Sequence, residues 1–416
     1  MVNMLFNEDS EILTKAGKIK TLYDPACGTG GMLSIGEQYV KELNPNAELK
    51  VFGQEINPES YAICKSDMLI KGQNPSNIKF GNTFTIDGLE DEQFDYMLSN
   101  PPFGVDWKKA QKIIKAEHES LGMQGRFGAG LPRINDGSFL FLQHMISKMK
   151  SSGTRIAIVF NGSPLFSGSA GSGESEIRKW IIENDWLEAI IALPDQLFYN
   201  TGISTYIWIV NNKKVEQRQG KVQLINATGV KDEELIKAGK RDTNRFWNKM
   251  ARSLGNKRKL IPENGNAKGI GFITQLYGNF QENECCKILP NEYFAYWRIT
   301  VEQPLKDENG KVLKSKGKPK PDTKKRDYEN IPFLRTTKVN GRSSLTPQTI
   351  EAYFKREVKP HLPDAWIDHK KTKVGYEINF TKYFYEFKPL RSLDAIRADI
   401  MALEESVKAN QQTVLD

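Results

Sequence analysis

Short apolar runs alternate with longer amphipathic stretches between Thr21 and about Asn211. The runs have the length of buried strands, and the stretches between them have the three- and four-residue apolar spacing of helices. Strands are predicted at Thr21–Asp24, Lys50–Gln54, Ile78–Gly81, Phe94–Ser99, Arg155–Phe160, Leu187–Ala192 and Thr205–Val210. Helices are predicted at Met32–Leu43, Glu59–Lys71, Ser138–Lys150 and Glu174–Asn184. This alternation favours βαβ units, and therefore an α/β fold with a mostly parallel sheet covered on both faces.

The alternation ends after Asn211. Residues 221–227 predict one more strand, and residues 231–300 are interpreted as helices and loops, so an α-rich C-terminal region is expected. Residues 303–330 are rich in Lys, Pro and Gly, which predicts a long exposed loop or a disordered hairpin. This segment is either a nucleic-acid-contacting arm or a solvated insertion, and the second interpretation is favoured about two to one.

The last residues of the chain predict an amphipathic helix. Its apolar positions are Leu393, Ile396, Ile400, Leu403, Val407 and Val414. Such a helix either contacts a partner subunit or packs on its own domain. Three regions are therefore expected: a catalytic domain at 1–230, an accessory region at 231–385 and a C-terminal helix at 386–416.

Composition narrows the class of protein. With 416 residues, 39% hydrophobic and 26% charged, the chain fits a globular protein of about two domains. No stretch approaches the roughly 18 uncharged apolar residues of a membrane helix, so no membrane partner is expected. The four cysteines and four histidines are not spaced like metal ligands, so no metal site is expected. The cysteines also show no disulfide pattern, which is typical of proteins in a reducing cytoplasm. A net charge of +8 suits a polyanionic partner.

A glycine-rich loop, Asp24-Pro-Ala-Cys-Gly28-Thr29-Gly30-Gly31, joins the first predicted strand to the first predicted helix. Glycines permit positive φ and close approach of the backbone to a ligand, and the helix N-terminus offers amide donors. A P-loop or dinucleotide loop is a competing interpretation, but neither GxGxxG nor a following Lys-Ser/Thr is present. The loop therefore predicts a cofactor site.

Two further residues follow strands in the same half of the predicted sheet. Glu55 ends the second strand, where an acidic side chain can accept hydrogen bonds from ribose hydroxyls. Asn82 follows the third strand, where it could contact the adenine of a cofactor, although Gly-Asn is also an ordinary turn.

The fourth predicted strand ends in Asn100-Pro101-Pro102-Phe103. Two prolines stiffen this corner and remove two backbone donors, which leaves carbonyls and the Asn100 amide oxygen as acceptors. Two such acceptors, from Asn100 and Pro101, can bind both hydrogens of an exocyclic amine and orient its lone pair. Phe103 offers a flat face on which an extruded base can stack.

In this order, these motifs resemble those of gamma-type amino-methyltransferases, and of the modification (M) subunits of type I restriction–modification systems in particular. The resemblance continues through Asp136–Leu142, Arg155–Phe166, Ala192–Phe198 and Gly375–Phe380. It implies a Rossmann-like S-adenosylmethionine-dependent methyltransferase fold and methylation of adenine N6 in DNA. It also implies Asp24, Gly28, Thr29, Gly30, Gly31, Glu55 and Asn82 as cofactor-binding residues, and Asn100, Pro101, Pro102 and Phe103 as catalytic ones.

The resemblance also implies partners: double-stranded DNA with a flipped adenine, a specificity (S) subunit, a restriction (R) subunit and a second M subunit. The C-terminal helix is then a candidate contact for the S subunit. Members of this family carry a helical N-terminal domain and an aromatic-x-Thr-Pro element ahead of the glycine loop. Only 23 residues precede Asp24 here, so the chain is expected to be a C-terminal portion of a longer M subunit.

Three other functions are open at this point. A protein-glutamine methyltransferase also uses Asn-Pro-Pro with an aromatic residue, a truncated chain could serve only as an assembly module, and residues 231–385 could read DNA in a solitary enzyme. Two glycine-rich segments, Gly125–Arg133 and Gly168–Gly173, are either DNA-facing mobile loops or simple connectors, at about even odds.

Overall fold

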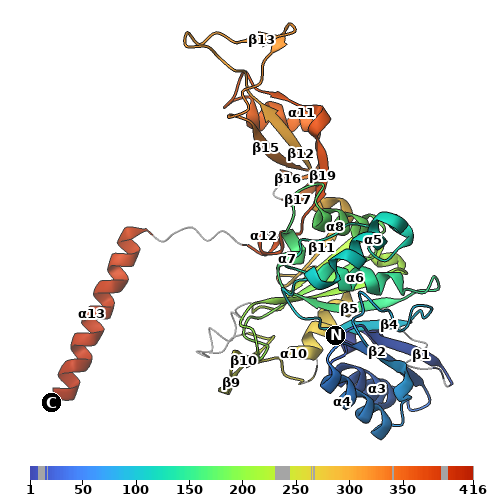
Figure 1. Cartoon of the computed structure of the whole chain (residues 1–416). Helices are drawn as coiled ribbons and strands as arrows, with labels where there is room; N and C mark the ends of the chain where they lie inside the picture. Colours follow the sequence, from blue (N-terminus) through green and yellow to red (C-terminus); the bar gives the residue numbers. More distant parts are fainter. Residues whose placement is uncertain are drawn as a thin grey trace. The chain divides into compact units, whose positions relative to one another are not determined.

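A computed structural model describes residues 1–7, 15, 17–229, 244–263, 265, 268–339, 342–385 and 392–415. Its central sheet has nine strands in the order β11-β8-β6-β7-β5-β4-β1-β2-β3 (Figure 1). Neighbouring strands are parallel except at β7 and β11, which run antiparallel to the strands beside them. The strands are β1 (Ile19–Asp24), β2 (Glu48–Glu55), β3 (Ile78–Phe80), β4 (Tyr96–Ser99), β5 (Arg155–Phe160), β6 (Leu187–Leu193), β7 (Thr205–Asn211), β8 (Lys221–Asn226) and β11 (Cys286–Pro290). The predicted α/β fold with a mostly parallel sheet is confirmed.

Helices cover both faces of this sheet, with α3 and α4 on one side and α5, α6 and α8 on the other (Figure 1). The α-helices of this part are α1 (Val2–Phe6), α3 (Gly31–Leu43), α4 (Pro58–Ile70), α5 (Gln111–Leu121), α6 (Ser138–Ser147), α7 (Ser163–Phe166), α8 (Gly173–Glu183) and α10 (Gly269–Asn279). Short 3-10 turns are η1 (Pro75–Asn77), η2 (Lys108–Ala110), η3 (Gly122–Gln124), η4 (Glu216–Arg218), η5 (Asn291–Phe294) and η7 (His369–Lys371). Helix α6 ends three residues before the predicted Lys150, because Met149 pairs instead with Phe94 beside the sheet.

The strands are recognisable in the sequence because both of their faces are buried. Every residue of β5 and β6 is buried, so these strands are continuous apolar runs without alternation. On one face, Leu22 and its neighbours pack against α1, α3, α4 and α10. On the other face, Phe139 of α6 packs edge-on against Phe160 and Trp208.

A buried acidic residue fastens α10 to the sheet. Glu188 of β6 is fully buried and accepts hydrogen bonds from Tyr277 Oη and from Asn211 Nδ2, the latter at 2.7 Å. Burial by itself would raise the pKa of Glu188, but the positive charges of Arg155 and Arg218 and these hydrogen bonds keep that pKa below its usual value. The charged carboxylate is therefore compatible with the core, and α10 is held over β8.

The C-terminal region is rich in strands, so the prediction of an α-rich region is wrong. Residues 295–380, here called the arm, hold β12 (Ala295–Glu302), β15 (Asp327–Pro332), β18 (Trp366–Ile367) and β19 (Lys373–Tyr376) in one antiparallel sheet. Small hairpins are β9–β10 (Asn248–Leu254, Lys257–Leu260), β13–β14 (Lys314–Ser315, Lys318–Pro319) and β16–β17 (Leu334–Val339, Arg342–Pro347). Helical turns there are α11 (Ile350–Tyr353), η6 (Phe354–Val358) and α12 (Phe380–Tyr383).

Apart from β12, which is mostly buried, and β19, which is half-buried, these strands escaped prediction because their residues are largely exposed or only partly buried. The burial of β15, for example, is confined almost entirely to Ile331. Apolar periodicity is the main signal for a strand, and strands paired at the surface lack it. The arm nevertheless has a small core of its own, formed by Ile299, Val301, Ile331, Phe354, Val358 and Ala365. Residues 303–326, predicted as a long exposed loop or a disordered hairpin, instead form a hairpin with the paired strands β13 and β14, and residues 327–330 belong to β15.

The chain divides into two compact units, Met1–Phe380 and Thr381–Asp416. The predicted C-terminal helix is present as α13 (Leu393–Leu415) in the second unit. The predicted boundary at 230/231 falls on residues outside the described part and remains a prediction. Among the described residues, no helix is both long and apolar enough to cross a membrane.

A buried arginine attaches the arm to the part of the first unit that carries the nine-stranded sheet. Arg178 of α8 is fully buried and donates to the carbonyls of Tyr376 (2.7 Å), Pro164 (3.1 Å) and Gly168 (3.3 Å). These carbonyls belong to β19, α7 and the loop before α8. Desolvation lowers the pKa of Arg178 to about 10, so the guanidinium is still charged at neutral pH.

We expect Arg178→Met to lower the free energy of unfolding by roughly 3 kcal/mol, because three buried carbonyls are deprived of a charged donor. The matched control is Lys179→Met on the same helix, whose side chain is 34% exposed and pairs only with Glu176. The control should stay within about 0.5 kcal/mol of the wild type. Urea unfolding measures both, and equal stability of the two variants would contradict the anchoring role of Arg178.

Candidate functional site

The glycine-rich loop connects β1 to α3 at the carboxyl edge of the sheet. Gly28 and Gly30 have left-handed φ angles of 55° and 82°. A Cβ on Gly30 would lie 2.7 Å from the sulfur of Cys64, so this position is closed to side chains by both backbone conformation and space. Thr29 and Gly31 are exposed at the start of α3, and no side chain caps that helix. Amide donors of its first turn therefore remain for a ligand.

Glu55, at the end of β2, is hydrogen-bonded to this loop. The Gly28 amide donates to Oε2 at 2.8 Å, and the Asn57 amide donates to Oε1 at 2.7 Å. A carboxylate has about four lone-pair sites, so it can still accept bonds from ligand hydroxyls. The structure therefore gives Glu55 a second task, that of holding the loop, which its spacing in the sequence did not suggest. Its role toward a ribose remains a prediction.

Asp24 connects the loop to the Asn100–Phe103 corner after β4. Its Oδ1 accepts hydrogen bonds from the Ala26 amide at 3.0 Å and from Ser99 Oγ at 2.8 Å, and the side chain is almost completely buried. Burial raises the pKa of Asp24 to about 7, against the opposing effect of these two hydrogen bonds. Since Ser99 immediately precedes Asn100, this bond sets the ends of β1 and β4 beside each other.

The four predicted catalytic residues form the corner after β4. Asn100 and Pro102 are exposed, Pro101 is buried and Phe103 is half-buried. The ring of Phe103 meets the ring of Phe198 edge-on, with centroids 6.2 Å apart and an interplanar angle of 86°. The sequence analysis placed Phe198 in a family motif but gave it no role. The sequence did contain a signal for Phe198, because an aromatic residue just beyond the end of a buried strand is well placed to reach a site at the strand ends.

An apolar pocket of about 250 Å³ lies beside Asn100. Its walls come from α1, the ends of β5 to β7 and α10, and it is lined by Met1, Asn3, Met4, Met32, Asn100, Val159, Leu193, Phe198, Ile207, Ile261, Ile270, Ile273 and Thr274. A concave, mostly apolar surface with a few polar side chains, here Asn3, Asn100 and Thr274, is typical of a ligand site. The sequence could not indicate it, because its walls are far apart along the chain.

Asn82 lies where it was predicted, after β3, but its oxygen is occupied. Asn82 Oδ1 accepts a hydrogen bond from the Phe84 amide at 2.9 Å, and the Thr85 amide donates to the Asn82 carbonyl at 3.0 Å. This is the ordinary turn that the sequence analysis weighed as its alternative. A contact between Asn82 and a cofactor remains a prediction.

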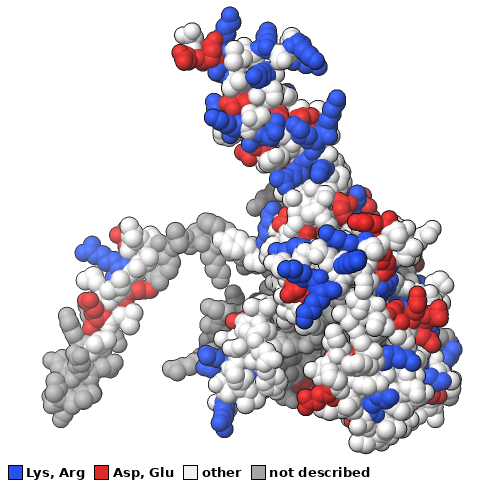
Figure 2. Space-filling model, in the orientation of Figure 1, with Lys and Arg blue, Asp and Glu red and all other residues white. Residues whose placement is uncertain are grey.

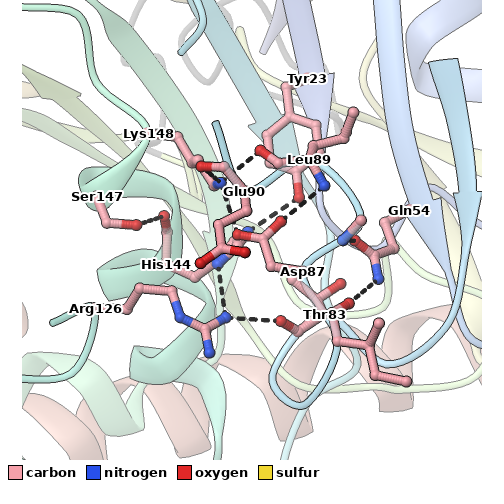
Figure 3. Close-up of polar contacts among 12 residues, drawn as sticks. Tyr23, Gln54, Thr83, Asp87, Leu89, Glu90, Arg126, His144, Ser147 and Lys148 are labelled. Carbon is pink, nitrogen blue, oxygen red and sulfur yellow. Dashed lines mark hydrogen bonds and ion pairs between the residues drawn. The ribbon is translucent and has the colours of Figure 1, made fainter. Parts of the chain in front are cut away.

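A buried polar network supports the loop from below (Figure 3). Thr83 Oγ1 donates to the Pro25 carbonyl at 2.6 Å, and Arg126 donates to the carbonyls of Thr83 and Phe84 at 2.9 and 3.1 Å. Arg126 also forms a two-pronged ion pair with Glu117. The guanidinium of Arg126 is therefore committed to the protein, which at this residue supports the connector interpretation of Gly125–Arg133.

The second glycine-rich segment, Gly168–Gly173, is also held by the protein. Arg178 donates to the Gly168 carbonyl, and the Ser172 hydroxyl caps α8 by accepting from the Ser175 amide. A Cβ on Gly171 would lie 2.9 Å from the side chain of Lys373 in the arm. These contacts support the connector interpretation of this segment.

His144 occupies the centre of the same network (Figure 3). Arg126 Nη1 lies 3.4 Å from Nδ1, and the Tyr23 hydroxyl lies 3.0 Å from Nε2. An arginine can only donate, so Nδ1 accepts and Nε2 carries the hydrogen that it donates to Tyr23. Burial, with Arg126 and Lys148 nearby, lowers the pKa of His144 to about 3 despite the opposing charge of Asp87.

Together, the predicted site residues lie on adjacent strand ends in the order β4, β1, β2, β3. This is the carboxyl edge of a doubly wound sheet, where such folds bind ligands. In the described part of the chain, no three His, Cys, Asp or Glu side chains are arranged to hold a metal ion. The strand order and the site define a Rossmann-like protein of the methyltransferase type.

Comparison with known families places the chain within this class. Residues 7–260, more than half of the chain, match the family described as N-6 DNA Methylase. The chain belongs to the N-6 DNA methylase family.

Curated relatives and solved structures agree with this assignment. The chain is 33% identical over 208 residues to the type I restriction enzyme MjaIX methylase subunit of Methanocaldococcus jannaschii, and 34% identical over 209 residues to the HindI methylase subunit of Haemophilus influenzae. Each match covers 50% of this chain but only 36% and 44% of the relative, so the chain spans less than half of their lengths. The crystal structure of a type I restriction-modification methyltransferase subunit from Streptococcus thermophilus shares the fold, with a TM-score of 0.53, 22% identity, and coverage of 70% of this chain and 54% of that one.

The lowered pKa of His144 predicts a pH-dependent stability. The unfolded state binds a proton on this histidine below about pH 6.5, whereas the folded state does not until about pH 3, so stability falls as the pH drops through this window. Between pH 7.5 and 5, we expect the wild type to lose about 2 kcal/mol more than His144→Gln. Urea unfolding at both values tests this, with His361→Gln at an exposed position as control. Parallel pH curves for the wild type and His144→Gln would rule the explanation out.

Proposed function

We propose that this chain transfers a methyl group from S-adenosylmethionine to the N6 amino group of adenine in DNA, as the modification subunit of a type I restriction–modification complex. The observation that carries the proposal is the hydrogen bond between Ser99 and Asp24, which sets the Asn100–Phe103 corner directly beside the glycine-rich loop. Membership of the N-6 DNA methylase family supports the same reaction.

The residues around the loop fit S-adenosylmethionine. The positive φ of Gly28 and Gly30 brings the backbone close to a ligand, and the uncapped first turn of α3 offers amides to a carboxylate. Glu55 would bind the ribose hydroxyls with the lone pairs that its two backbone bonds leave. S-adenosylmethionine supplies the methyl group as an electrophilic sulfonium. By the family pattern, Asp24, Thr29, Gly31 and Asn82 complete the cofactor site.

The corner after β4 would prepare the adenine amine. Asn100 is exposed and adjoins the apolar pocket, so its amide oxygen is accessible to a base there. This oxygen and the Pro101 carbonyl would accept the two amine hydrogens and orient the nitrogen lone pair toward the methyl group. Phe103 and Phe198, whose rings already meet edge-on, would enclose the flipped base and exclude water.

The partners follow from the proposed complex. DNA, an S subunit, an R subunit and a second M subunit are proposed partners, and the cytoplasm is the proposed compartment. Helix α13 exposes Leu393, Ile400, Leu403 and Val407, which makes it the proposed contact with the S subunit. Because the relatives are more than twice as long as the part they share with this chain, an assembly module without catalysis is the second candidate.

The testing experiment is methyl transfer from labelled cofactor to DNA by the chain with its S subunit, followed by digestion to nucleosides. Label in N6-methyladenine supports the proposal. Label in a glutamine-containing peptide but not in DNA would favour a protein-glutamine methyltransferase. Absence of both cofactor binding and methylation would favour the assembly module.

Asn100→Ala should abolish methylation while leaving the affinity for S-adenosylmethionine within about twofold, because it removes an acceptor that acts only on the amine. The matched control is Asn46→Ala, an exposed asparagine ahead of β2 at the opposite edge of the sheet, which should retain full activity. Loss of cofactor affinity together with activity in Asn100→Ala would show that the corner has been misassigned.

Glu55→Gln should weaken the binding of S-adenosylmethionine by about tenfold or more, equivalent to about 1.4 kcal/mol. The substitution replaces one acceptor oxygen by an amide donor that faces a backbone N–H or a ribose hydroxyl. Glu59→Gln, at an exposed position in the first turn of α4, is the charge-matched control. Calorimetry measures all three proteins, and an unchanged dissociation constant for Glu55→Gln would refute its assigned role.

A further inference from the structure

The positive charge of this chain is concentrated in the arm. Residues 295–380 hold 19 Lys and Arg and 11 Asp and Glu, whereas the whole chain holds 59 and 51. The rest of the chain therefore holds 40 of each and is formally neutral, so the entire net charge of +8 belongs to the arm. In Figure 2, basic side chains crowd the part of the surface that carries the arm.

Within the arm, the charge is highest in the segment between β12 and β15, here called the basic hairpin (residues 303–326). It contains nine Lys and Arg and three Asp and Glu. Its backbone is ordered by hydrogen bonds from the Leu305 amide to the Lys320 carbonyl and from the Leu313 amide to the Leu305 carbonyl, both at 2.8 Å. The hairpin therefore presents its charges from a defined backbone rather than from an unstructured tail.

The lysines at the tip of the basic hairpin have no ion-pair partners among the described residues. Lys314, Lys316, Lys318 and Lys320 fall within seven residues around the β13–β14 turn, and all are exposed. The ion pairs of the basic hairpin lie elsewhere in it, at Lys306 with Asp364, Lys325 with Asp322 and Arg326 with Glu302. Four like charges so close together repel one another, and a polyanion would relieve that repulsion.

The chemistry of the tip favours a phosphate backbone over base edges. Residues 314–320 read Lys-Ser-Lys-Gly-Lys-Pro-Lys and contain no Arg, Asn, Gln or aromatic side chain. Arg, Asn and Gln read bases by paired hydrogen bonds, and aromatic rings stack on bases. Lysine can also contact guanine, but without a planar fork of donors it acts mainly as a point charge, which suits phosphate. Contacts of this kind position a protein on DNA without choosing a sequence.

We propose that the tip of the basic hairpin binds the phosphate backbone of DNA outside the methylated base, independently of sequence. The inference rests on the proposed function, since it takes DNA as the polyanion. It assigns to the arm a DNA contact separate from the corner after β4 and from any sequence choice by an S subunit.

The test compares two quadruple variants with the same change in charge. One is Lys314→Gln/Lys316→Gln/Lys318→Gln/Lys320→Gln. The other is Lys41→Gln/Lys50→Gln/Lys71→Gln/Lys221→Gln, at exposed positions outside the arm. Binding of a random-sequence DNA duplex by the full chain is measured over a range of salt concentrations. The tip variant should bind the duplex roughly tenfold more weakly at low salt. The slope of log binding constant against log salt concentration should become shallower by up to about 3.6, since each phosphate that a lysine no longer neutralises removes about 0.9.

Each outcome decides the proposal. An unchanged slope in the tip variant, or an equal weakening in both variants, overturns it, and so does a wild-type chain that does not bind the duplex. If the tip variant keeps the salt slope of DNA binding but no longer binds S subunit from which nucleic acid has been removed by nuclease, the tip is a protein-binding surface instead. If the slope falls as expected but no protein methylates adenine, the DNA contact stands and the proposed function fails. If both stand, the tip variant keeps its kcat at saturating DNA and shows a raised KM for DNA.

Discussion

The hydrogen bond from Ser99 to the buried Asp24 is the contact on which the arrangement of the site depends. It joins the last residue of β4 to the last residue of β1, two neighbouring parallel strands, away from bulk water. In the same loop, Glu55 of β2 holds Gly28. Three strand ends are thus fastened to one another by side chains, so the glycine-rich loop and the Asn100–Phe103 corner keep their separation. The proposed methyl transfer would depend on such preorganisation, because the rate of a group transfer depends on the alignment of two reactants.

The part of the fold that forms the nine-stranded sheet was readable in the sequence because several of its strands are short and buried on both faces, and because helices separate β1 from β2, β2 from β3, β4 from β5 and β5 from β6. β5 and β6 show this pattern plainly, and each was predicted to within one residue. The loop and the corner were readable for a related reason. In a parallel sheet the carboxyl ends meet along one edge, so motifs placed after strands are neighbours in space. Gly28, Glu55 and Asn100 therefore needed no long-range information to be grouped.

The remainder depends on contacts that leave no local pattern. The arm was misread because strands such as β15 pair at the surface and carry polar residues on both faces. The contacts of Arg126 could not be foreseen, because the Thr83 carbonyl that it binds is 43 residues away in the sequence. Phe198 came into the site through its ring contact with Phe103 and its place in the wall of the pocket. In each case the deciding neighbour is distant in sequence, and one-dimensional periodicity carries no information about it.

The pocket beside Asn100 has a consequence for how the protein is made. One wall contains Met4 and another contains Ile273, so the walls of the pocket come from segments that are far apart in the sequence. Contacts of such high sequence separation close large loops and form late in folding. During synthesis the glycine-rich loop can become ordered on its own strands, whereas the pocket stays open until α10 has left the ribosome. A nascent chain therefore completes its glycine-rich loop before the pocket beside Asn100 can close.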